Sequence, residues 1–396
     1  MSTPPPFQIP SGAVANLYII DTTGTIENLG AEHLVKPDLS SFTVFPTIPS
    51  WSFLIETTTT AAATDSGSPR RVLFDLGIPK DIPGLPPSVS DRLANSGYVI
   101  EIPKTTAEVL KESASSLGQN RPLELKDIEA VVWSHWHWDH QGDIQEFPNT
   151  TDLIVGPGFG KAFLPAYPEG PESPIRQKDL EGRRLRELNF SGTDQSTKIG
   201  KIPAMDYFGD GSFYLLDTPG HAVGHLGGLV RTTKNPDTFV FLGGDLTHHG
   251  GELRPSEFLS LESASKDVAA SSSSSSEGGS DRQQVTVQKT LESLQTSRGR
   301  RVDQAFFDPV ITADEQQALQ TIAHTQEADA QENVYYIAAH DLPIREVVDF
   351  FPNKANGWKE RGWREKTLWT FLRDFRGSFE SNREAFRQAY LQCPGC

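Results

Sequence analysis

The sequence predicts a layered α/β fold, because strand-like and helix-like segments follow one another along the 396 residues. Short apolar runs rich in β-branched and aromatic residues recur throughout the chain, and Gly, Pro or Asn bounds them. Stretches with helical spacing of apolar residues lie between the runs. With 36% hydrophobic residues, the chain can bury a proper core.

The expected elements follow in chain order. Strands are expected at residues 16–21, 41–48, 51–57, 70–77, 128–134, 152–156, 212–217, 238–244 and 333–339. Helices are expected at residues 105–116, 285–298 and 312–330, and along a C-terminal stretch near 358–391.

Residues 263–284 are not expected to belong to the core. Their composition, with six consecutive serines at Ser271–Ser276, cannot bury enough apolar surface to become ordered. Strands that carry candidate site residues lie on both sides, so we interpret the segment as a flexible insertion. The chain is therefore expected to form a single domain over 1–396, with a core at about 15–345 and a helical extension at about 346–396.

Composition also excludes several classes of protein. The net charge of −16 argues against a nucleic-acid partner, which would need a basic face. No window approaches eighteen consecutive apolar residues, so neither a membrane-spanning helix nor a membrane partner is expected. The two cysteines, Cys393 and Cys396, offer no disulfide framework, and the N-terminus lacks the layout of a secretory signal. These features predict a cytoplasmic protein.

The segment SHWHWDHQGD, residues 134–143, concentrates three of the ten histidines and an aspartate within six positions. His135 and His137 follow an apolar strand and alternate along it, so both imidazoles can reach one ion. Asp139 and His140 follow as the chain turns. Imidazole and carboxylate ligands together suit Zn²⁺. The alternative interpretation is a solvated loop rich in histidine.

Three further apolar runs end in residues that can bind a metal. They end at or just before His221, Asp245 and His340. Four strands that each deliver such a residue at the carboxyl end indicate one shared edge of a sheet assembly. The sequence therefore predicts a metal site at that edge.

Taken together, H-W-H-W-D-H, T-P-G-H, Asp245 and the late His340 resemble the motifs of the metallo-β-lactamase superfamily. The segment VLFDLG resembles the early strand of that fold, with Asp75 in the position that supports the site. The resemblance spans about 15–345 and implies an αββα sandwich with two zinc ions at one edge of its facing sheets. It implies His135, His137 and His221 as ligands of the first zinc, Asp139, His140 and His340 as ligands of the second, and Asp245 as the bridge between them.

The same resemblance implies a hydrolase. Members that destroy β-lactam antibiotics usually carry Cys or Ser where this chain has Asp245, and the iron-dependent redox branch carries Glu where it has His137. Lactonases and thioesterases similar to glyoxalase II remain. The leading hypothesis is a zinc-bound hydroxide that opens a lactone or a lactam, with Asp139 orienting the nucleophile or relaying its proton.

Alternatives remain open. A thioesterase is disfavoured because Lys and Arg are only scattered, whereas an iron-dependent thiol or persulfide oxygenase would use the same ligands. A non-catalytic binding protein is disfavoured because all seven ligand positions are filled. The expected partner is a small-molecule substrate, and the aromatic stretch 357–369 could dock on the core, cap the site or form a homodimer contact.

His248 is the candidate proton donor. Lactonases that resemble this chain carry a tyrosine three residues after the bridging aspartate, and this chain has His248 there, followed by His249. A histidine can also protonate a leaving group. The alternative is that His248 or His249 only caps or packs the loop. His225 is expected to orient ligands rather than to bind metal.

Overall fold

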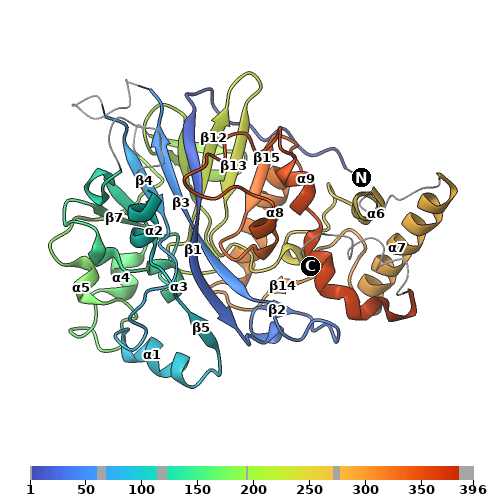
Figure 1. Cartoon of the computed structure of the whole chain (residues 1–396), viewed down its shortest axis with the longest axis horizontal. Coiled ribbons are helices and arrows are strands. Elements are labelled where there is room, and N and C mark those ends of the chain that lie inside the picture. The colour runs from blue at the N-terminus through green and yellow to red at the C-terminus, as the bar shows by residue number, and fades with distance from the viewer. Residues whose placement is uncertain (1, 60–67, 114–122, 193–194, 271–276, 383–396) are drawn as a thin grey trace.

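Two sheets face each other at the centre of the molecule, and helices lie on both sides of them (Figure 1). The protein is described by a computed structural model that covers residues 2–59, 68–113, 123–192, 195–270 and 277–382. This arrangement of helix, sheet, sheet and helix confirms the predicted αββα sandwich.

The first sheet has seven strands in the order β5-β1-β3-β4-β6-β7-β8. Their bounds are β1 Ala15–Glu27, β3 Ile48–Thr57, β4 Arg71–Phe74, β5 Val99–Glu101, β6 Ala130–Val132, β7 Asp152–Val155 and β8 Leu185–Glu187. β4, β6, β7 and β8 are parallel neighbours. The carboxyl ends of β4 and β6 therefore meet at one edge, which brings Asp75 beside Ser134.

The second sheet has six strands in the order β15-β13-β12-β11-β10-β9. Their bounds are β9 Ser196–Ile199, β10 Ile202–Asp206, β11 Phe213–Asp217, β12 Leu226–Thr233, β13 Thr238–Leu242 and β15 Val334–Ile337. β11 and β13 are both antiparallel to β12, and β13 is parallel to β15. β11, β13 and β15 therefore run in the same direction, and their carboxyl ends lie at the same edge of the sheet. A separate two-stranded sheet pairs β2 (Val35–Lys36) with β14 (Asp308–Pro309).

Helices cover the outer faces. The α-helices are α1 Pro87–Ala94, α2 Thr106–Ser113, α3 Trp138–Gln141, α4 Phe159–Phe163, α5 Gln177–Leu180, α6 Leu261–Ala270, α7 Glu277–Ser297, α8 Glu315–Asp329 and α9 Trp363–Thr367. The 3-10 helices are η1 Ala31–His33, η4 Leu125–Asp127, η5 Ile144–Glu146, η6 Gly250–Glu252, η7 Leu342–Glu346 and η8 Thr370–Asn382.

The core lies in three layers that match the sandwich. Phe74 and Val132 of the first sheet meet Leu215 and Val240 of the second in one buried cluster. On the outer faces, α2 packs on the first sheet in a second cluster and α8 packs on the second sheet in a third. Burial on both faces of each sheet fixes the strand ends that carry the site residues.

Several expected elements differ from the structure. Residues 41–48 form no strand before Ile48; instead Phe42 and Phe45 pack into a side cluster with the C-terminal segment. The C-terminal stretch near 358–391, expected to be helical, is interrupted within its described part: Gly362 adopts a left-handed φ of 65°, and α9 and the 3-10 helix η8 follow it. Helices α6 and α7 cover most of 263–284, where a flexible insertion was expected.

The remaining expectations concern membranes and the segments outside the described ranges. No helix in the described part of the chain is long and apolar enough to cross a membrane. Ser271–Ser276, Cys393 and Cys396 lie outside the described residues.

Candidate metal centre

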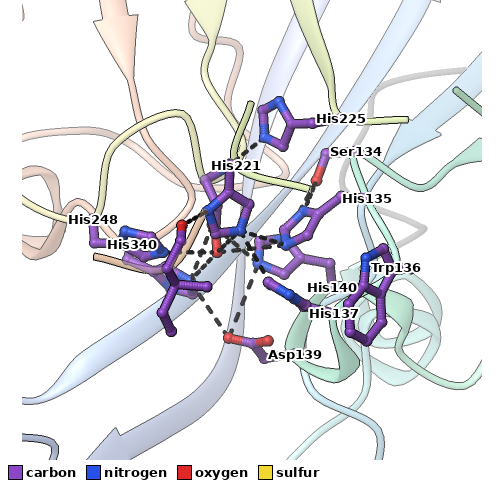
Figure 2. Close-up of polar contacts among 12 residues, drawn as sticks. Ser134, His135, Trp136, His137, Asp139, His140, His221, His225, His248 and His340 are labelled. Atoms are coloured by element: carbon purple, nitrogen blue, oxygen red, sulfur yellow. Dashed lines mark hydrogen bonds and ion pairs between the residues drawn. The ribbon is translucent and has the colours of Figure 1, made fainter. Parts of the chain in front are cut away.

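The structure brings all seven predicted ligands to one edge of the sandwich (Figure 2). His135 follows β6, His221 follows β11, and Asp245 and His340 follow the parallel strands β13 and β15. His137 lies at the start of α3, and that short helix carries the remaining two ligands, Asp139 and His140. Residues as far apart in sequence as 135 and 340 thus meet because their strands end at the same edge.

The ligand atoms form two adjacent groups. His135, His137, His221 and Asp245 make one group, and Asp139, His140 and His340 make the other; within each group the atoms lie within 4.8 Å of one another. Asp245 lies between the groups. Its Oδ1 is 3.1 Å from the Nε2 atoms of both His140 and His340, and its Oδ2 is 3.6 Å from His135 Nε2. This is the placement expected of a carboxylate that bridges two ions.

Hydrogen bonds on the far ring nitrogens orient the imidazoles. His221 Nδ1 donates to the Ile311 carbonyl at 3.0 Å, His340 Nδ1 to the Pro49 carbonyl at 2.6 Å, and His140 Nδ1 to Asp75 Oδ2 at 2.9 Å. A neutral imidazole carries one proton, so each Nε2 presents a lone pair to the cluster.

The fit to a metal is supported by atoms that protein groups leave unsatisfied. Buried His140 Nε2 and Asp245 Oδ1 have no hydrogen bond of acceptable geometry in the described part of the chain. Because its Nδ1 donates to the Ile311 carbonyl, His221 Nε2 is an acceptor, and it lies 3.2 Å from His135 Nε2 and 3.1 Å from His137 Nδ1. Three ring nitrogens this close together suit a metal ion that each of them can ligate.

Burial and neighbouring charges set the protonation states. Burial, followed by the charge of nearby histidines, lowers the pKa of His135 and His221 well below its usual range. Burial also lowers the pKa of His137 to about 4. Burial alone would raise the pKa of Asp245, but His140 and the surrounding imidazoles hold it well below its usual value. Burial alone would lower the pKa of His140 and His340, but Asp245 and the neighbouring carboxylates raise it. Binding of a metal would therefore release protons from these two imidazoles.

Asp75 lies at the end of β4 and supports the centre from behind. Its Oδ2 accepts from His140, and its Oδ1 accepts the Ser134 N–H at 2.6 Å. Its φ of 59° places it in the left-handed region, which Asp tolerates better than most residues. The carboxylate thereby fixes both the start of the ligand loop and the orientation of one ligand.

His225 lies next to the cluster but has no free lone pair. Its Nε2 accepts the backbone N–H of Asp245 at 3.1 Å, and its Nδ1 lies 3.0 Å from the Thr218 carbonyl. Burial lowers the pKa of His225 to about 4. These contacts position Asp245 and agree with the expectation that His225 orients ligands.

The adjacent histidines after Asp245 point in different directions. His248 faces the cluster, with Nε2 3.4 Å from Asp245 Oδ2 and its ring stacked on that of His340 at 6.0 Å between centroids. His249 instead packs between aromatic rings and contacts Asp374 Oδ2 at 3.3 Å through Nε2. His249 therefore packs the loop, whereas His248 faces the metal ligands.

Glu252 is a buried carboxylate that sequence reasoning missed. Its Oε2 accepts the backbone N–H groups of His248 at 2.6 Å and of His249 at 2.9 Å. These hydrogen bonds hold the turn between Asp245 and η6. The one local signal was an acidic residue four positions after His248, a pattern too common to mark a site.

A cavity of about 340 Å³ opens from the cluster. His137, Asp139, Asp245, His248 and His340 line one end. Apolar side chains of β1, β3 and α1, and of Leu29 and Leu34 on either side of η1, form most of the remaining wall. Trp138 also lines the cavity, and its buried ring packs in a core cluster as well.

Comparison with known proteins agrees with the fold. Residues 113–295 match the sequence model of the metallo-beta-lactamase superfamily. Gamma-lactamase FDB1 of Fusarium pseudograminearum is 38% identical over 377 residues, covering 94% of this chain and 85% of that protein. Gamma-lactamase MBL2 of Gibberella moniliformis is 50% identical over 190 residues, covering 48% of this chain and 76% of that protein.

Other matches are partial or more distant. The chain is 38% identical to cytochrome P450 monooxygenase mpaDE' of Penicillium brevicompactum over 385 residues, which is 96% of this chain but 40% of that protein. A B. thuringiensis AiiA variant, solved with N-decanoyl-L-homoserine bound, is 18% identical and covers 86% of this chain and 99% of its own, with a TM-score of 0.49. On the sequence matches along most of its length, the chain belongs to the metallo-β-lactamase superfamily.

Proposed function

We propose that the protein is a hydrolase that uses two zinc ions to open a cyclic ester or a cyclic amide. The observation that carries this proposal is the position of Asp245 between two groups of ligand atoms that line a partly apolar cavity. The names of the relatives, two of them γ-lactamases, support the choice of a cyclic substrate.

The seven residues would divide between the two ions. His135, His137 and His221 would hold one ion, Asp139, His140 and His340 the other, and Asp245 both. Bound zinc supplies Lewis acidity and makes water a nucleophile near neutral pH. The cavity walls exclude bulk water from the reacting bond, which strengthens the electrostatic interactions there.

Asp139 is the residue best placed to handle the proton of the attacking water. Its carboxylate lines the cavity, and its Oδ2 lies 3.4 Å from His340 Nε2. It can therefore orient a nucleophile toward the carbonyl carbon and accept its proton.

His248 is placed to protonate the leaving group. It lines the same cavity and faces Asp245, and Glu252 holds its backbone. An amide nitrogen leaves far more readily when it is protonated, whereas an alkoxide depends less on a donor. An imidazole at this position therefore supports lactam as well as lactone opening.

A thioesterase is less well supported. Glutathione and coenzyme conjugates carry several anionic groups and need a correspondingly basic pocket. In this cavity Arg92 is the one lining side chain with a permanent positive charge among the described residues.

The proposed function is tested by comparing three substrate classes on the same zinc-loaded sample. A γ-lactone, a γ-lactam and an acyl thioester are assayed at equal concentration with the wild type and with Asp245→Ala. We expect turnover of the lactone or the lactam, abolished in the variant. Turnover of the thioester alone, or of no substrate, would contradict the proposal.

A further inference from the structure

We propose that Arg92 and Tyr98 form a subsite for a carboxylate of the substrate, in the wall of the cavity that the metal ligands also line. This inference rests on the proposed function and adds the substrate class. The substrate would be a cyclic ester or amide whose apolar ring body carries an anionic group remote from the scissile bond.

Arg92, in the last turn of α1, and Tyr98, just before β5, line the same cavity as Asp139, Asp245 and the ligand histidines. Leu29 and Trp138 are among the apolar residues in its wall. A volume of about 340 Å³ is near the lower limit for small-molecule sites, so one compact ring compound can contact both sets of polar residues.

Arg92 is exposed and Tyr98 is half-buried, and the protein uses neither donor. Neither the Arg92 guanidinium nor the Tyr98 hydroxyl has a hydrogen bond or an ion pair with any described residue. By contrast, Ser96 in the same wall donates to the Leu93 carbonyl at 2.7 Å, and His33 lies 3.8 Å from Glu32. In a chain with 52 acidic and 36 basic residues, an arginine without a carboxylate partner is available to an external anion.

Both groups line the same cavity, from segments only six residues apart in sequence. Burial raises the pKa of Tyr98, the charge of Arg92 opposes that rise, and the charge of Glu32 adds to it. A guanidinium offers two parallel N–H donors to a carboxylate, and the phenol adds a third. Since Asp139 and Asp245 belong to the metal-ligand groups, binding of a substrate anion at Arg92 also sets which end of the molecule faces those ligands.

The test uses two aromatic γ-lactones that differ at one ring position. One carries a carboxylate at the ring edge opposite the ester, and the other carries a neutral carboxamide there. Values of kcat/KM are measured for the zinc-loaded wild type, Arg92→Gln, Arg92→Lys and Tyr98→Phe. Lys354→Gln is the matched control, because it removes the same charge from an exposed side chain that lines none of the described cavities.

We expect the wild type to prefer the carboxylated lactone. Arg92→Gln should lower kcat/KM for that substrate about 10- to 100-fold and change the neutral one less than about 2-fold, as for loss of a charge-assisted hydrogen bond. Tyr98→Phe should lower kcat/KM for the carboxylated lactone about 5-fold. Arg92→Lys should retain part of the preference, Lys354→Gln should retain all of it, and added salt should weaken it.

Two other outcomes would overturn the inference in different ways. If the wild type hydrolyses both lactones equally well, or Arg92→Gln lowers both equally, the subsite is refuted while the proposed function stands. If the wild type hydrolyses neither lactone nor any lactam, the proposed function fails and the subsite fails with it.

Discussion

Asp75→Asn tests how the fold supports the metal centre. The substitution keeps the size of the side chain, and Asn tolerates the left-handed φ of 59° at this position. It removes the charge that accepts from His140 at 2.9 Å. The Asn side chain can still accept the Ser134 N–H, but its NH₂ group would then face the N–H of His140.

The expected magnitude follows from these contacts. Asp75 is 1% exposed and His140 is fully buried, so the lost hydrogen bond is a buried, charge-assisted one. Such a bond contributes about 1.5–3 kcal/mol. Partners of this kind typically change metal affinity about 10- to 100-fold when removed. The two ranges agree, because 100-fold corresponds to about 2.7 kcal/mol.

The assay is competition for zinc with a chromophoric chelator, together with urea unfolding of the metal-free protein. Asp179→Asn is the control, because Asp179 is equally buried and pairs with Arg176 at 2.6 Å, away from the cluster. The control should lose stability without losing zinc affinity. Wild-type zinc affinity in Asp75→Asn, or an equal loss in Asp179→Asn, would refute the reasoning.

Three further predictions follow from the surrounding residues. His248→Gln should lower kcat about 100-fold or more with zinc content unchanged, and should affect a lactam more than a lactone; unchanged kcat in steady-state assays would contradict a donor role. Phe375→Ala should destabilise the protein by about 3 kcal/mol in urea unfolding, because the fully buried ring packs against His249; a loss under about 1 kcal/mol would show that this packing is dispensable. The third prediction concerns His225: burial lowers the pKa of its imidazole to about 4. Between pH 6.5 and 4 the unfolded chain binds this proton and the folded one does not, so stability is lost as pH falls. In metal-free His225→Asn, that loss should be shallower by about 1.4 kcal/mol per pH unit; equal slopes would contradict the assignment.

The ligands could be predicted because their pattern is local. His135, His137, Asp139 and His140 fall within six positions, and the others each follow an apolar run that is a strand in the structure. Register and burial then fix where those strands end. The resemblance to a known family supplied the order of the sheets, which spacing alone does not determine.

The cavity wall and the packing of the site loop could not be predicted in this way. Arg92 and Tyr98 line the same cavity as the metal ligands only because segments distant in sequence fold together. The contact between His249 and Asp374 spans 125 residues, and neither residue has a local pattern that marks it. Glu252 acts through backbone N–H groups, for which the sequence carries no specific signal.

The secondary-structure prediction was wrong where local composition and tertiary packing favour different structures. Residues 41–45 are rich in aromatic and β-branched types, yet Phe42 and Phe45 pack against the C-terminal segment instead of joining a sheet. Within 263–284, the segment Ser263–Ala270 contains several helix-forming residues, and α6 begins at Leu261, which is buried together with Ala264 in the same cluster.

Zinc content measured together with cyclic-substrate hydrolysis tests the central claim most directly. Elemental analysis of the purified protein should give about two zinc ions per chain, and the same sample should hydrolyse a lactone or a lactam. Asp245→Ala should lose both zinc and turnover. About one iron per chain with no hydrolysis of any substrate class would contradict the account and assign the protein to oxidative chemistry on the same fold.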